Sequence, residues 1–290
     1  MAVNFMKYKW LYFAISFLVL IPGVFSLVKY GLRLSIDFTG GTLLEIQTPA
    51  ADFKKIASDQ NLELSSVVSS SDNTYLLRFK HLDATGSAAF KAALGPDVVE
   101  KRFESVGPVV GAELARRAVM AVGLASLAII AYIAWSFRFV PKPYSSWKFG
   151  ASAVVALLHD VLVVVGLFAL FGHLYHVEID ALFVTALLTV IGFSVHDTIV
   201  VFDRVRENLP KMPHKTFSQV VDFSLSETLV RSLNTSLTVI LTLTALLVFG
   251  GESTRWFVVA LLVGIVSGTY SSIFNAAPLL VLWETTKSQK

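Results

Sequence analysis

The chain has 290 residues, of which 54% are hydrophobic and 16% are charged, and its formal net charge is +3. Soluble domains carry about 25% charged residues, so this composition excludes an ordinary soluble domain and indicates a membrane protein. The excess of basic over acidic residues does not indicate a nucleic-acid partner, because membrane proteins gather Lys and Arg in their cytoplasmic loops. The sequence contains no cysteine, which excludes disulfides, thiolate metal sites and thiol nucleophiles.

Six apolar segments are long enough to cross a bilayer, which takes about 20 mostly apolar residues. The first, from Trp10 to Val28, is too long for the apolar part of a cleaved signal peptide and lacks a small-residue cleavage site. We therefore expect it to be a retained signal anchor. The six predicted spans are 10–29, 115–136, 149–171, 180–202, 232–250 and 256–283.

Basic residues in the short connections predict the orientation. Twelve lysines and arginines lie at the two termini and in the connections that follow spans two and four, whereas the opposite short connections contain only Arg255. The positive-inside rule therefore predicts that both termini are cytoplasmic. The predicted parts are a cytoplasmic N-terminus with the first span (1–29), an outer domain (30–114) and a five-span bundle (115–290) with a cytoplasmic loop (203–231). The amphipathic stretch at about 210–230 predicts an interfacial helix.

Residues 30–114 are too polar to span the membrane, and their pattern predicts a small α+β domain. Its runs are LRLSIDF and TLLEIQT on either side of Gly40-Gly41, the helix ADFKKIASDQ, the strands SSVVSSS and TYLLRFK around a Ser-Asp-Asn turn, the helix GSAAFKAALG and the strand VVEKRFESV. If the first two runs form one interrupted strand, the order is β-α-β-β-α-β, as in a ferredoxin-like fold. Its single histidine and scattered carboxylates favour binding or mechanical work over chemistry.

The fourth span carries an ionisable pair, His196 and Asp197, inside an otherwise apolar run. Asp197 lies about 10 Å before Arg204, in the inner half of the bilayer. An ionisable group at that depth is costly, so it indicates a functional site unless a neighbouring hydroxyl satisfies it within a polar helix seam. Helical spacing places one polar stripe on this span, formed by Thr185, Thr189, Gly192 and His196.

The fifth span has a polar face, and the third span has a second ionisable pair. The face is formed by Arg231, Asn234, Thr235, Thr238 and Thr242. Arg231 lies at a depth similar to that of Asp197, so it either extends to water or forms an ion pair with Asp197, which could then load and release a proton. His159 and Asp160 lie near the middle of the third span, where Asp160 is either a second protonatable site or a hydrogen-bonding contact between spans. Rows of small residues around Gly264 and Gly268 predict a helix-packing face on the sixth span.

Several motifs follow one another along nearly the whole chain. They are DFTGGT at 37–42, VGPVVGAEL at 106–114, HD at 159–160, GFSVHDTIVVFDRVREN at 192–208 and ETLVRSLNTS at 227–236. This organisation resembles the SecF proteins of the bacterial SecD/SecF family, each of which is similar to half of an RND-type transporter. The resemblance implies six transmembrane helices with a ferredoxin-like extracytoplasmic domain between the first two.

The resemblance also implies a function and a set of partners. Such proteins pair with SecD and act with the SecYEG channel, with YajC as a further partner, on a translocating preprotein in the bacterial inner membrane. They use the proton motive force late in export, with protons as coupling ion and with no metal or other cofactor. The family's functional Asp and Arg correspond to Asp197 and Arg231, and its turn motif corresponds to Asp37, Gly40 and Gly41. Where the family commonly has Asn, this chain has His196, which either replaces an amide hydrogen bond or adds a titratable group.

Three other functions are weighed against this one. An intramembrane aspartyl protease could use Asp160 and Asp197, but it would need a Gly-x-Gly-Asp string, and the chain has Ser-Val-His-Asp. A proton-coupled transporter of a small solute or metal could use the two His-Asp pairs as ligands, although we expect them to lie at different depths. A structural scaffold for SecD would need no proton coupling. The sequence therefore favours a transport component over an enzyme.

Overall fold

The computed structural model describes residues 4–49, 51–69 and 73–285. The chain divides into two compact units, each of which is described by itself. The transmembrane bundle comprises Met1–Leu32, Ala121–Val177 and Leu182–Lys290, and the α+β domain comprises Arg33–Met120 and Glu178–Ala181. The short segment Glu178–Ala181, which connects two helices of the bundle, therefore belongs to the α+β domain.

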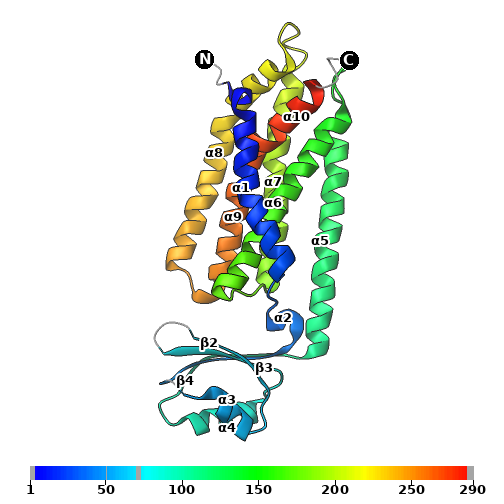
Figure 1. Cartoon of the computed structure of the whole chain (residues 1–290). Coiled ribbons are helices and arrows are strands. Elements are labelled where there is room, and N and C mark those ends of the chain that lie inside the picture. The colour runs from blue at the N-terminus through cyan, green and yellow to red at the C-terminus, as the bar shows by residue number, and fades with distance from the viewer. Residues whose placement is uncertain (1–3, 50, 70–72, 286–290) are drawn as a thin grey trace. The chain divides into compact units, whose positions relative to one another are not determined.

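Within the described ranges, six helical segments are long and apolar enough to cross a membrane, as the sequence predicts. The first begins with a 3-10 turn (η1, Phe5–Tyr8) and continues as α1 (Lys9–Tyr30). The next four are α5 (Pro108–Ser136), α6 (Ser146–Tyr175), α7 (Ala181–Asn208) and α8 (Phe217–Phe249). The last is formed by η2 (Glu252–Thr254), α9 (Arg255–Ser271), a π-helical turn (η3, Ser272–Ala276) and α10 (Ala277–Thr285) (Figure 1). The chain is therefore a multi-pass membrane protein.

The predicted loop at 203–231 is mostly helical. Helix α7 continues to Asn208, and α8 begins at Phe217. The hydroxyl of Thr216 caps α8 by accepting a hydrogen bond from the Gln219 amide, while the Gln219 side chain accepts one from the Thr216 amide, which forms a capping box. The apolar face of this stretch is buried against protein, because the Phe217 ring packs on Tyr144 and Phe149. The predicted interfacial helix is instead the first part of α8.

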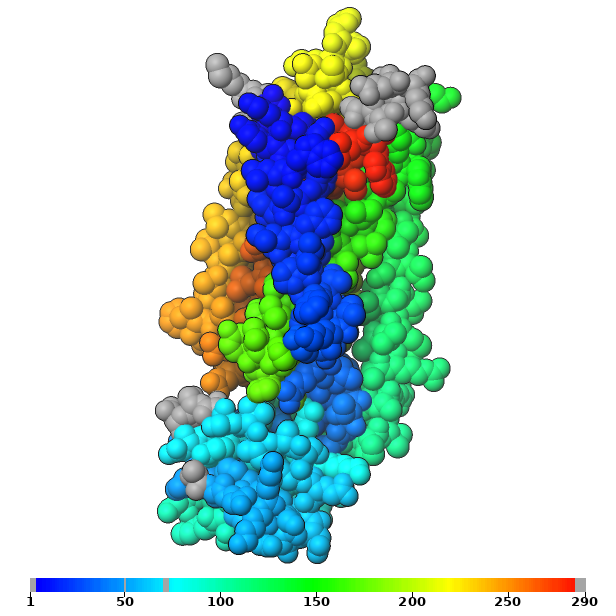
Figure 2. All heavy atoms as spheres, viewed as in Figure 1, coloured from blue at the N-terminus to red at the C-terminus, as the bar shows by residue number. Residues whose placement is uncertain are grey.

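Small residues allow close helix contacts in the bundle. A Cβ atom on Gly166 of α6 would lie 2.8 Å from the Cα atom of Gly23 on α1, so only glycine fits at this crossing. On α9, a Cβ atom on Gly264 would collide with the Val190 side chain of α7, which confirms the predicted packing face of the last span. Figure 2 shows α1 on the outside of the bundle, where most of its large apolar side chains are exposed.

The α+β domain is built on a four-stranded antiparallel sheet within its described residues. The strands are β1 (Gly41–Gln47), β2 (Leu64–Ser69), β3 (Thr74–Phe79) and β4 (Val99–Val106), in the order β2-β3-β1-β4. Its helices α3 (Phe53–Asp59) and α4 (Ala84–Leu94) begin at the capping carboxylates of Asp52 and Asp83. Inward side chains of the strands pack on both helices, and Phe79 meets Phe90 edge to face. The predicted ferredoxin-like fold is confirmed.

The start of the domain differs from the prediction. The run LRLSIDF is not part of a strand, because Ile36–Thr39 forms a single helical turn (α2) and only Leu34 makes an isolated bridge, with Ile179. The hydroxyl of Ser35 accepts a hydrogen bond from the Asp37 amide and caps this turn. Gly40 and Gly41, the residue with which β1 begins, then adopt φ of +70° and +120°, which favour glycine. The predicted Ser-Asp-Asn turn falls largely on residues 70–72, outside the described residues.

Candidate functional site

Two buried carboxyl groups lie on neighbouring spans of the bundle. Asp160 on α6 is 0% exposed, and Asp197 on α7 is 3% exposed. Burying a carboxyl group away from water is costly unless hydrogen bonds or a counter-charge compensate it. Their hydrogen bonds therefore show what each carboxyl group can do.

Asp160 is surrounded by hydrogen-bond donors from three elements. The hydroxyls of Ser194 on α7 and Ser271 on α9 each donate to Oδ2 at 2.6 Å, and that of Ser267 on α9 donates to Oδ1 at 2.7 Å. Nδ1 of His159 lies 3.0 Å from Oδ1. An ionised carboxylate only accepts hydrogen bonds, at about four lone-pair positions. The three serine hydroxyls occupy three of them, and His159 occupies the fourth in the tautomer that carries its proton on Nδ1. The sequence predicts that Asp160 is either a hydrogen-bonding contact between spans or a second protonatable site. The structure shows the contact between spans, and the protonatable site stays a prediction.

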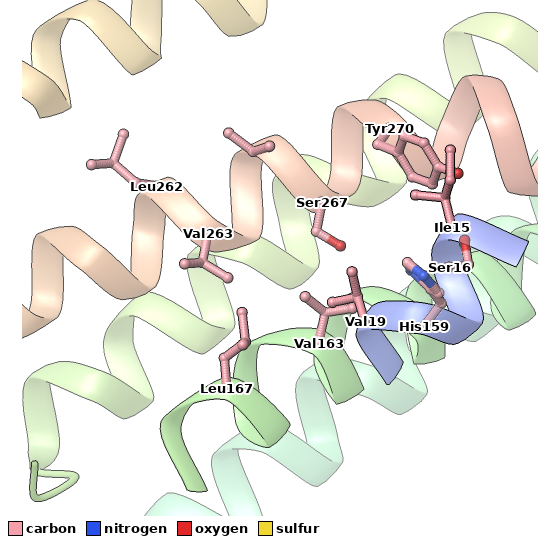
Figure 3. Close-up of a pocket in the computed structure, with 11 residues that line it drawn as sticks. Ile15, Ser16, Val19, His159, Val163, Leu167, Leu262, Val263, Ser267 and Tyr270 are labelled. Atoms are coloured by element: carbon pink, nitrogen blue, oxygen red, sulfur yellow. The ribbon is translucent and has the colours of Figure 1, made fainter. Parts of the chain in front are cut away.

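His159 borders an apolar groove between α1, α6 and α9 (Figure 3). The groove has a volume of about 450 Å³, and its walls include Val19, Val163 and Val263. Nε2 of His159 is buried and has no hydrogen-bond partner among the described residues. This lining suits hydrocarbon better than a charged or polar solute, so the groove does not favour a small-solute transporter.

Asp197 is much less satisfied than Asp160. Its Oδ2 atom is buried without a hydrogen-bond partner in the described part of the chain. Two of the neighbouring hydroxyls are used elsewhere, since Ser194 donates to Asp160 and Thr198 bonds to the Ser194 carbonyl and to Ser272. Ser236 of α8 is the hydroxyl that interacts with this carboxyl group, and it leaves Oδ2 without a partner. The structure therefore does not show a polar helix seam in which a neighbouring hydroxyl fully satisfies Asp197. An unsatisfied buried acceptor costs about 1–3 kcal/mol, which makes Asp197 a strong candidate for a group that changes partner or protonation state.

The predicted ion pair between Asp197 and Arg231 is not formed among the described residues. Arg231 is near enough to act on the carboxyl group by its charge, but its side chain lies on the exposed face of α8. Adjacent residues of a helix point about 100° apart, and it is Ser232, together with Ser236 one turn later, that is buried on the inner face. Forming the ion pair would require α8 to turn or Arg231 to change rotamer.

The two predicted polar stripes are exposed faces of α7 and α8. On α7, Thr185, Thr189, Gly192 and His196 are exposed, and on α8 the exposed residues are Arg231, Asn234, Thr235, Thr238 and Thr242. Several hydroxyls only bond to carbonyls of their own helix, as Thr235 does to Arg231 at 3.0 Å and Thr238 to Asn234 at 2.8 Å. Polar residues inside the membrane normally face protein or a water-filled space. These stripes therefore indicate a surface that another protein or water covers.

The turn motif lies in the α+β domain and not with the buried carboxyl groups. Oδ2 of Asp37 accepts a hydrogen bond of 3.0 Å from the amide of Ala181, the first residue of α7. A Cβ atom on Gly40 would lie 2.6 Å from the Cα atom of Pro108, and one on Gly111 would lie 2.7 Å from the Gly40 nitrogen. The motif thus packs against the first turn of α5. The predicted site residues consequently occupy separate places in the fold.

Some contacts of these groups could not be assigned from the sequence. Ser267 and Ser271 are recognisable as a small-residue row by their spacing, but spacing does not show that they face Asp160. Arg78 and Glu178 form an ion pair across 100 residues, for which the sequence holds no signal. In the described part of the chain, no three His, Cys, Asp or Glu side chains gather to hold a metal ion.

Comparison with known proteins assigns the family. Residues 87–286 match the model described as "Protein export membrane protein SecD/SecF, C-terminal", and residues 25–48 match "SecD/SecF GG Motif". The chain belongs to the SecD/SecF family. It is 45% identical to "Protein translocase subunit SecF" of Thermobaculum terrenum, over 97% of this chain and 94% of the relative. It is also 36% identical to "Protein translocase subunit SecDF" of Bacillus subtilis, over 96% of this chain and 38% of that protein.

A solved structure supports the same assignment within the SecD/SecF family. The crystal structure of SecDF from Thermus thermophilus matches with a TM-score of 0.82 and 33% identity, covering 98% of this chain and 39% of that chain. This chain therefore spans less than half of the SecDF chains that it resembles. Both buried carboxyl groups and Arg231 fall within the first family match, and Asp37, Gly40 and Gly41 fall within the match to the GG motif.

Proposed function

We propose that this chain is a SecF-type subunit of the Sec protein-export machinery, which uses the proton motive force to promote the late stage of preprotein translocation. Family membership and the likeness to translocase subunits support the role in export. Proton coupling rests on one observation, the buried Oδ2 atom of Asp197 that lacks a hydrogen-bond partner among the described residues. Asp197 is flanked by the exposed His196 and is within electrostatic range of Arg231, so a proton and a counter-charge compete for it.

The coupling step we propose is a change of partner at Asp197. When Asp197 is ionised, Arg231 attracts it and favours an arrangement in which α7 and α8 bring the two groups together. Protonation removes that attraction and favours the separated arrangement seen here. One charge crossing 100 mV supplies about 2.3 kcal/mol, whereas switching a two-state element from 1:99 to 99:1 takes about 5.5 kcal/mol. We therefore propose that more than one proton is used per cycle.

The partners follow from the exposed polar faces and from the fused relatives. Because SecDF chains hold both halves in one polypeptide and this chain matches 38–39% of them, we propose that a separate SecD supplies the other half. The polar stripes of α7 and α8 are the surface we assign to that contact, which would remove them from lipid. SecYEG, YajC and the preprotein complete the proposed assembly in the bacterial inner membrane, with protons as the coupling ion. Both termini would be cytoplasmic and the α+β domain extracytoplasmic.

Replacing Asp197 tests this function. In membrane vesicles that contain the full export machinery, Asp197→Asn is expected to abolish the stimulation of export by a proton gradient, because the amide cannot carry a proton or attract Arg231. Export without a gradient should be unchanged. Asp203→Asn is the matched control, since Asp203 lies on the same helix and forms an ion pair with Arg206. Full gradient-dependent export by Asp197→Asn would instead support a structural scaffold for SecD.

A further inference from the structure

Three connecting segments of the α+β domain meet in one cluster, which we call the basal node. It is formed by residues 33–41 after α1, residues 107–111 at the start of α5 and residues 178–181 between α6 and α7. All three segments belong to the α+β domain. The node is therefore where the chain passes from the domain into α7, the helix that carries Asp197.

Backbone hydrogen bonds hold the first and third segments together. The amide of Ile179 donates to the Arg33 carbonyl at 2.7 Å, and the amide of Ser35 donates to the Ile179 carbonyl at 2.9 Å. Leu34 and Ile179 thereby form a parallel bridge. Ile179 is 7% exposed and Leu34 is 40% exposed, so the pairing is shielded from water on the side of Ile179.

Charged side chains extend this contact to the sheet. Arg78 of β3 forms an ion pair with Glu178 and also donates a hydrogen bond of 3.2 Å to the Leu34 carbonyl. Arg33 lies 3.9 Å from Glu178 on its other side. The side chains of Arg78 and Glu178 are only 18% and 19% exposed. A half-buried contact that joins Arg78 to both Glu178 and the Leu34 carbonyl resists sliding of the 178–181 segment along the sheet.

Asp37 completes the node at the start of α7. The first amides of a helix have no partner within the helix, and the Asp37 carboxylate accepts one of them, from Ala181. A negative charge at this end also interacts favourably with the helix dipole. Asp37 is held in place because the adjacent turn is fixed by the close crossing of Gly40 with Pro108 and Gly111.

We propose that the basal node couples α7 to the α+β domain through the chain itself, with Asp37 as the positioning residue that holds Ala181, the residue of that domain with which α7 begins. The inference rests on the proposed function, because it assigns the path by which the state of Asp197 reaches the domain. A helix transmits displacement along its axis only if its end is attached. In α7, Asp197 lies about 24 Å from Ala181 by helical rise, and the node provides that attachment.

Hydrogen exchange in the reconstituted complex tests the path directly. Comparison of the chain with and without Asp197→Asn should show changed amide protection in α7 around residue 197 and also in segments 33–41 and 178–181. After Asp37→Ala, the change around residue 197 should persist, while the change in 33–41 should disappear. A response of segment 33–41 that survives Asp37→Ala would overturn the inference. If Asp197→Asn alters α7 but never the node, the inference fails and the proposed function stands.

Export measurements separate coupling from a loss of folding. Asp37→Ala should reduce gradient-stimulated export at least several-fold and leave gradient-independent export intact, while Asp37→Asn, which keeps an acceptor oxygen, should restore most of it. Asp52→Ala is the matched control, because Asp52 caps α3 in the same domain through the Lys55 amide at 3.1 Å. Equal losses in Asp37→Ala and Asp52→Ala would reduce the role of Asp37 to domain stability and overturn the proposal.

A covalent bridge offers a rescue experiment. The chain has no cysteine, so Leu34→Cys with Ile179→Cys introduces a single pair at the bridge, to be joined by a short bifunctional thiol reagent. Joining them should restore gradient-stimulated export to Asp37→Ala, because the covalent link replaces the lost attachment. In the chain with Asp37 intact, the link should leave export unchanged. Inhibition there would show that the node opens during the cycle and would contradict a permanent attachment.

Discussion

Asp160 and Asp197 are the same residue type, at similar burial, on spans that pack in one bundle, yet their surroundings differ. Asp160 has four hydrogen-bond partners, three serine hydroxyls and the His159 ring, drawn from α6, α7 and α9. Asp197 keeps one oxygen without a partner among the described residues and has a cation at a distance. A fully bonded carboxylate cannot change partner without losing several hydrogen bonds, whereas a partly bonded one can do so at low cost. The comparison assigns Asp160 to holding helices together and Asp197 to movement.

The largest expected effect is that of Asp160→Ala on stability. Removing the carboxylate leaves three serine hydroxyls and one imidazole without their partner and opens a cavity in the bundle. Each buried polar group left without its partner costs about 1–3 kcal/mol, so thermal unfolding in detergent should begin well below that of the unmodified chain. Asp160→Asn, which keeps an acceptor oxygen, should cost less. Unfolding of Asp160→Ala at an unchanged temperature would remove the distinction between the two carboxyl groups.

A third carboxyl group, Glu178, provides an intermediate case outside the spans. Burial raises its pKa above the ordinary 4.5, and the opposing charges of Arg78 and Arg33 only partly offset this. Because the folded state then holds the proton more tightly than the unfolded state, the contribution of Glu178 to stability falls as pH rises from 4.5 towards the folded pKa. Glu178→Gln should remove this part of the pH dependence, as measured by melting temperature between about pH 4 and 7. A steeper profile in Glu178→Gln would contradict the sign.

The smallest expected effect is that of Asp197→Asn on stability. The amide replaces a carboxyl group that is not fully hydrogen-bonded, so the melting temperature should stay the same or rise slightly, in contrast to Asp160→Asn. Asp203→Asn serves again as the control for the helix. A large loss of stability in Asp197→Asn would show that the carboxyl group is a structural contact like Asp160, and it would weaken the case for partner exchange.

The regular parts of this fold were predictable because their signals are local. Apolar runs predict the spans, alternation and turn residues predict the ferredoxin-like sheet, and helical spacing predicts which polar residues of α7 and α8 share a face. Contacts between distant helices were not predictable in the same way. The spacing of Ser267 and Ser271 defines a face of α9, but only packing shows that this face meets Asp160. Likewise, helical spacing predicts the face of α8 that carries Arg231, but it does not show that this face points away from Asp197.

Two differences have local causes that a pattern search cannot detect. LRLSIDF alternates like a strand, but the Ser35 cap and the positive φ of Gly40 and Gly41 turn the chain before a ladder can form. The polar region at 203–231 reads as a loop because it is charged. Its helices persist there because tertiary contacts hold them. For example, the side-chain amide of Asn208 donates hydrogen bonds to Ser224 and Glu227 of α8.

The crossing of Gly23 and Gly166 has a consequence for the order of assembly during synthesis. Because α1 is made before α6, Gly23 enters the membrane while its partner helix is still untranslated. Until then α1 must persist as a single helix in lipid, and its outward apolar side chains, such as Phe17, Leu18 and Phe25, allow it to do so. When α6 enters the membrane, the two glycines bring no side chains to the crossing. No side-chain rotamer therefore has to be selected before the helices make contact. We therefore expect a bulkier residue at Gly23 or Gly166 to slow the biogenesis of the protein before it changes the activity of the folded protein.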